Sequence, residues 1–107
     1  AEDAVVAAQS MIELSRINGP YYKRAALLEP FLGERERCMD LLDAMEDQLG
    51  VALREADWTL PEVRQAILEV EKARRSLKMG YHIGYTMKNL CLCMDMRRLT
   101  EDILWQK

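Results

Sequence analysis

The chain is poor in the residues that mark several classes of protein. Its 107 residues include five Gly, three Pro, three Cys, two Trp, four Tyr and one Phe. So few glycines and prolines exclude a collagen-like or low-complexity chain, and three cysteines are too few for a disulfide-dense secreted scaffold. No stretch approaches 18 uncharged apolar residues, and the first twenty positions lack a basic start followed by an apolar block. We therefore expect no transmembrane helix and no signal peptide, and we expect the chain to be intracellular and cytoplasmic.

What is present is typical of one ordinary globular domain. Half of the residues are hydrophobic and 31% are charged, a balance that excludes intrinsic disorder. A chain of this length is expected to fold as a single domain spanning residues 1–107, with about two-thirds of its surface buried.

Apolar residues recur at the three- and four-residue steps of a helix along most of the chain, and the alternation typical of strands is scarce. The pattern predicts helices over residues 2–17, 20–31, 34–56 and 59–105, of which the second is short. We therefore expect an all-α fold, a small antiparallel bundle of three long helices plus one short helix.

The last predicted helix begins at the clearest local signal in the chain. Thr59 and Glu62 have the spacing of a capping box, and Pro61 suits a first helical turn, in which no backbone donor is needed. Trp58 and Val63 flank the box at the positions of a hydrophobic staple.

That last helix would be up to about 45 residues or about 68 Å long, which is too long for a compact bundle. It either protrudes and pairs with a partner, or it bends or breaks near Gly80 and Gly84. A heptad seam read from Val63 carries small residues that let another helix approach closely. The seam predicts close packing inside the bundle, or alternatively a homodimer contact. Its residues are Val63, Ala66, Val70, Ala73, Leu77, Gly80, Gly84, Met87, Cys91 and Met94.

Charge is divided unevenly along the chain. Residues 1–57 carry twelve acids and six bases, whereas residues 58–107 carry six acids and nine bases. The two halves would complement each other if antiparallel helices pair within the bundle. The alternative is a basic patch that steers an acidic partner. The residues of this predicted patch are Lys72, Arg74, Arg75 and Lys78.

The C-terminal part of the chain has more apolar width than one contact with a three-helix core requires. Four of the seven methionines lie between positions 79 and 96. Methionines at helical spacing are ordinarily core residues, but exposed methionines also line helix-binding grooves. We expect this surface to bind another protein, a helix or helical bundle of acidic character, with a homodimer as a further option. No membrane contact is expected, and nucleic acid is not the expected partner. The predicted contact residues are Met87, Leu90, Met94, Leu99, Ile103 and Trp105.

The alternative hypothesis places phosphate chemistry around the one histidine, His82. Arg75 lies seven residues before His82 and would share its helix face, with Lys78 and Tyr85 within a turn. Cationic groups around an imidazole suit a phosphate. Arg75-x6-His82 is similar to the Arg-x(4 to 6)-His pattern of HEPN-type helical ribonucleases, which implies cleavage of RNA without a metal ion.

A second form of the phosphate hypothesis is histidine phosphotransfer. His82 with Gly84 resembles the phosphotransfer pattern, but Tyr85 and Thr86 stand where that pattern has Lys and Gly.

Cys91 and Cys93 point to opposite sides of a helix, so the cysteines predict free thiols and no metal site. With no phosphate loop and no catalytic triad in the spacing, we expect a binding protein that is not an enzyme and uses no cofactor.

Overall fold

The computed structural model describes residues 2–105, including all of their side chains except those of residues 102 and 105. All regular structure in this range is helical, which confirms the all-α prediction. The elements are α1 (Glu2–Arg16), α2 (Tyr21–Ala26), the 3-10 turn η1 (Glu29–Phe31), α3 (Arg35–Arg54), α4 (Leu60–Lys78), α5 (Ile83–Cys93) and α6 (Met96–Trp105).

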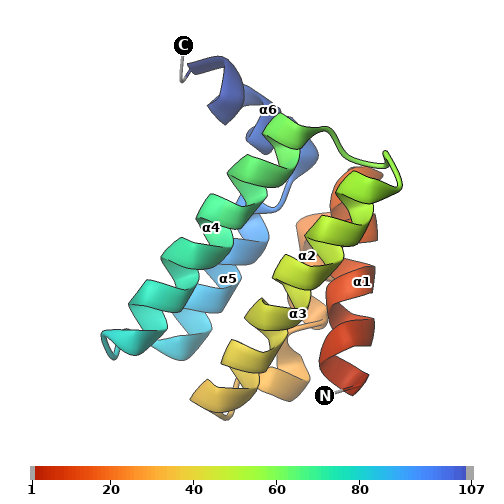
Figure 1. The fold of residues 1–107 in the computed structure, drawn as a ribbon. Helices are drawn as coiled ribbons and strands as arrows, with labels where there is room; N and C mark the ends of the chain where they lie inside the picture. Colours follow the sequence, from red (N-terminus) through yellow and green to blue (C-terminus); the bar gives the residue numbers. More distant parts are fainter. Residues whose placement is uncertain (1, 106–107) are drawn as a thin grey trace.

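The helices form one bundle in which α3 and α4, and likewise α4 and α5, run antiparallel, whereas α1 and α3 run in the same direction (Figure 1). α1 packs against α3, α3 against α4, and α4 against both α5 and α6, while the short α2 contacts α1 and α5. Figure 1 shows α3 and α4 side by side, with α6 lying beyond the far end of the α4–α5 pair. None of the helices in residues 2–105 has the length and apolar character needed to cross a membrane.

The predicted start of α4 is confirmed. The Glu62 amide donates to Thr59 Oγ1 at 3.4 Å, and the Thr59 amide donates to Glu62 Oε1 at 2.8 Å. These two bonds satisfy donors that have no partner inside the helix. Trp58 and Val63, the proposed staple residues, are both buried.

The predicted 45-residue helix does not exist, because the chain reverses direction after Lys78. Gly80 has a positive φ of 85°, a conformation that costs glycine little, and α5 begins at Ile83. Arg35 supports this turn by donating to the carbonyl of Leu77 at 2.7 Å. The expectation of a break near Gly80 is thus confirmed, whereas Gly84 lies inside α5.

A second break, between α5 and α6, was not predicted. Asp95 stands between the two helices and accepts a hydrogen bond from the Arg97 amide at 2.9 Å. An aspartate in front of a helix is a common N-terminal cap. The residue type was therefore a usable signal, although the apolar periodicity runs through it.

The heptad seam is core along α4, where all five of its residues are buried. They are Val63, Ala66, Val70, Ala73 and Leu77.

One buried charge ties the two halves of the chain together. The side chain of Arg24, on α2, is 1% exposed. Its Nε donates to the carbonyl of Cys91 at 2.9 Å, and its Nη1 donates to the carbonyl of Gly19 at 2.6 Å. Both carbonyls lie at or beyond the C-terminal end of a helix, where the partial charge is negative and favours a cation.

Replacing Arg24 tests how much its hydrogen bonds to the Cys91 and Gly19 carbonyls stabilise the fold. Because Arg24→Ala leaves two inward-facing carbonyls without these donors, we expect it to lower the free energy of unfolding by about 3 kcal/mol. Urea denaturation followed by circular dichroism measures the change. The neighbouring exposed residue supplies the control, since Lys23→Ala should change stability by less than about 0.5 kcal/mol.

Gly50 lies inside α3, and nothing in the single chain requires a glycine there. A Cβ added at this position meets only Arg54 Nη1, at 3.5 Å, which is an ordinary contact. A glycine in a helix interior costs about 1 kcal/mol relative to alanine. We therefore expect Gly50→Ala to raise the free energy of unfolding by about 1 kcal/mol in the same assay. A loss of stability would show that α3 is packed more tightly at Gly50 than the structure indicates.

Candidate functional site

The structure buries most of the apolar surface predicted to contact a partner. Met87, Leu90, Met94 and Leu99 are at most 3% exposed, so the prediction that they form an exposed contact surface is wrong. The physical reason is the reversal after Lys78 together with the break after Cys93, which place α5 and α6 against α4 and bury the surplus apolar surface inside the bundle. Ile103 is half-buried, and the side chain of Trp105 lies outside the described part of the structure.

A different set of side chains is exposed on the outer face of α4. Leu68 is 55% exposed and Met79 is 69% exposed, and the exposed cations Lys72 and Arg75 lie between them. Steps of four, three and four residues place these four side chains on one face of a helix. We call Leu68, Lys72, Arg75 and Met79 the α4 stripe.

Two tyrosines extend this surface across a shallow hollow between α4 and α5. The hollow, of about 100 Å³, is lined by Glu69, Lys72 and Ser76 from α4 and by Tyr81 and Tyr85, among others. Tyr81 is 56% exposed and Tyr85 is 78% exposed. The α4 stripe and these two tyrosines together form the candidate docking surface.

The four cations predicted to steer a partner divide into two groups. Arg74 donates to Asp43 Oδ1 at 2.7 Å and to Glu46 Oε1 at 2.9 Å, so it joins α4 to α3 within the chain. This ion pair bears out the interpretation that antiparallel helices complement each other in charge. Arg74 is therefore not available as a steering charge.

Lys72, Arg75 and Lys78 are exposed and form none of the ion pairs found among the described side chains. The pKa of Glu71 is lowered first by a hydrogen bond with Glu46 and then by the charges of Arg74, Arg75 and Lys78, so two of these three exposed cations act on it. From residue 72 to residue 94 the sequence contains no acid. The candidate docking surface is therefore a positively charged one.

His82 has a structural role at the start of α5. It is the N-terminal cap of that helix, and its Nδ1 accepts a hydrogen bond from the Tyr85 amide at 3.1 Å. Because α4 ends at Lys78, Arg75 and His82 lie on separate elements, so the prediction that they share one helix face is wrong. The phosphate hypothesis thus loses its geometric basis, although Arg75, Lys78, His82 and Tyr85 are all exposed.

The cysteines are separate and inaccessible. Cys38, Cys91 and Cys93 are free and buried, and burial raises the pKa of Cys91 to about 12. A thiol of that kind is a poor nucleophile and a poor metal ligand at neutral pH. Within the described residues, no cluster of three or more His, Cys, Asp or Glu side chains could hold a metal ion.

The sequence held a signal for the α4 stripe that the prediction did not use. Leu68 and Met79 lie on the helix face opposite the heptad seam, where apolar residues are not needed for the core. The predicted contact surface was instead chosen from the methionine-rich segment, whose apolar side chains face the core.

A scan against protein-family models, a search of curated proteins and a search of solved structures all find no match to this chain.

The role of His82 can be tested by substitution. His82→Ala removes the cap and should lower the free energy of unfolding by about 1 kcal/mol, whereas His82→Asn supplies another good cap and should change it little. Thermal unfolding of the three chains measures this difference. Equal destabilisation by both substitutions would contradict the capping role.

Proposed function

We propose that this chain is a protein–protein interaction module, of the adaptor or assembly kind, that binds an acidic helical protein through the candidate docking surface. The observation that carries the proposal is that exposed apolar side chains and cations occur together on this surface. Four large apolar or aromatic side chains, each more than half exposed, surround cations that form no ion pair among the described residues. They are Leu68, Met79, Tyr81 and Tyr85.

Each part of this combination has a recognised use in binding. Exposed apolar side chains contribute affinity when a partner covers them, and aromatic residues are enriched among the residues that dominate binding energy. Unpaired cations at the rim steer an acidic partner and speed its encounter. The α4 stripe runs from residue 68 to residue 79, which is eleven helical steps or about 16 Å, long enough to lie along three turns of a partner helix.

A protein suits this surface better than a nucleic acid. Tyrosines beside lysines can also bind single-stranded nucleic acid, because bases stack on aromatic rings. The α4 stripe, however, begins and ends with the aliphatic side chains of Leu68 and Met79, which offer no platform for stacking. The whole chain also carries a net charge of −3, which opposes binding to a polyanion.

We further propose that the module acts in the cytoplasm. The three buried thiols are compatible with a reducing compartment, where disulfides are rare.

A photo-crosslinking experiment tests the docking surface directly. The photoreactive residue p-benzoylphenylalanine replaces Tyr85 in the full chain, and in a matched variant it replaces Tyr22, which is on α2 and 67% exposed. Irradiation in the native cells, followed by mass spectrometry, identifies the products. We expect the Tyr85 variant to give a discrete protein adduct that the Tyr22 variant does not give.

The double substitution Lys72→Glu/Arg75→Glu, combined with the Tyr85 probe, should reduce the yield of that adduct at least tenfold, because it replaces attraction with repulsion. Lys23→Glu should leave the yield unchanged. Adducts that are identical at Tyr85 and Tyr22, or an adduct to RNA at Tyr85, would overturn the proposal.

A further inference from the structure

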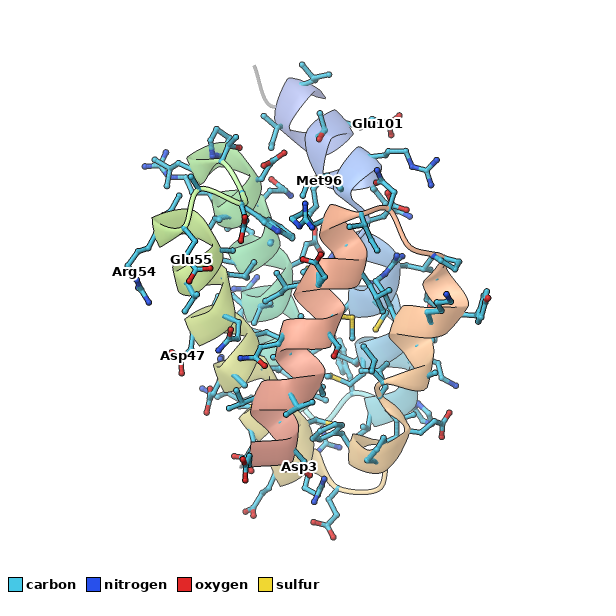
Figure 2. All side chains as sticks on the ribbon, turned by 90° about the vertical axis from the view of Figure 1, so that its right-hand side faces the viewer. Asp3, Asp47, Arg54, Glu55, Met96 and Glu101 are labelled. Atoms are coloured by element: carbon cyan, nitrogen blue, oxygen red, sulfur yellow. The ribbon has the colours of Figure 1, made fainter. Side chains whose placement is uncertain are left out.

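An acidic stripe lies on α3, the helix that packs antiparallel beside α4. Asp40, Asp43 and Asp47 are exposed and occupy one face of the helix, and Gly50 continues that face. Figure 2 shows Asp47 pointing away from the bundle on the outer side of α3. Asp43 also binds Arg74, whereas Asp40 and Asp47 form none of the ion pairs found among the described side chains.

The cations of the α4 stripe and the carboxylates of the acidic stripe lie at matching heights along the helix axes. Arg74 binds Asp43 and Glu46, which fixes the position of α4 along α3. Each residue adds 1.5 Å of length to either helix, so the same number of residues counted from this ion pair reaches the same height on α3 and on α4. Because the helices are antiparallel, Arg75 lies at about the height of Asp43, and Lys72 at about the height of Asp47.

The same counting places Leu68 about level with Gly50, where the face of α3 has no side chain. The absence of a Cβ costs stability and is not explained by any contact inside the chain, as described above. A close approach by another molecule at this level would explain it, because glycine is used where a neighbour comes near the backbone.

We infer that the acidic helical partner is a second copy of this chain, with the α4 stripe of each copy lying on the α3 face of the other. This inference rests on the proposed function and names its partner. A two-fold axis parallel to α3 and α4 brings α3 of one copy opposite α4 of the other without changing the levels. Lys72 and Arg75 then meet Asp47 and Asp43 of the second copy, and Leu68 enters the notch at Gly50.

The arrangement is closed and self-complementary. A two-fold axis makes both contacts equivalent, so the assembly stops at two copies and does not extend into a filament. Each contact is only about 16 Å long and has few apolar residues, which is typical of a small, weak interface. The dimer should accordingly be sensitive to salt, because exposed charge pairs are screened.

Sedimentation equilibrium of the full chain tests the inference by charge swapping. One variant carries Lys72→Glu and the other carries Asp47→Lys, because these two residues face each other across the proposed interface and neither takes part in the ion pair of Arg74. In each variant alone this pair becomes repulsive at both reciprocal contacts, so we expect the dimer dissociation constant to rise at least tenfold. An equimolar mixture of the two restores opposite charges at both contacts and should associate again.

Three further chains complete the experiment. Lys72→Glu and Asp47→Lys together in one chain should restore its homodimer, and Gly50→Leu should weaken the dimer at least tenfold by filling the notch. The control Lys23→Glu should leave the dissociation constant unchanged. Circular dichroism confirms that each chain is folded before its mass is measured.

The outcomes separate this inference from the proposed function. A wild-type chain that stays monomeric at low salt and about 0.1 mM, or a mixture of swapped variants that fails to associate, overturns the dimer. If the Tyr85 probe still captures a specific acidic protein in that case, the proposed function stands without it. If the dimer fails its test and the Tyr85 probe captures no specific acidic protein, both the dimer and the proposed function are overturned.

Discussion

The reversal of the chain after Lys78 determines which residues of the C-terminal half face the core. Gly80 supplies the left-handed conformation for the turn, and Arg35 donates to the carbonyls of Leu77 at 2.7 Å and Tyr81 at 3.3 Å. Without this turn, Met87 and Met94 would continue along a projecting helix and be open to solvent. With it, they lie against α4, and the outer face of α4 becomes the surface on which Leu68 and Met79 remain exposed.

Much of the fold followed from the sequence because its signals are local. Helical periodicity located α1, α3 and the start of α4 to within a few residues, and the capping box of Thr59 and Glu62 was identified from spacing alone. The break before α6 was missed because Asp95 caps a helix within an apolar pattern that does not change there. The burial of Met87 and Met94 could not be predicted, since it depends on which way the chain turns and not on periodicity.

The candidate surface depends on a difference between arginines that sequence cannot show. Arg74 and Arg75 are neighbours of the same charge, yet one is bound to two carboxylates of α3 and the other is exposed. A rotation of about 100° between successive residues of a helix separates the two environments. The excess positive charge of the second half is thereby divided between the internal pairing of Arg74 and the exposed cations Lys72, Arg75 and Lys78.

The buried guanidinium of Arg24 has a consequence for how the protein is made. Its acceptor, the Cys91 carbonyl, lies 67 residues further along the chain, so α2 cannot form this hydrogen bond until α5 has been synthesised. During translation the first helices would emerge from the ribosome with this guanidinium still hydrated and with the apolar side of the bundle open to solvent. Completion of the bundle is therefore a late, long-range event, and a nascent chain that stalls before residue 91 offers a natural substrate to chaperones.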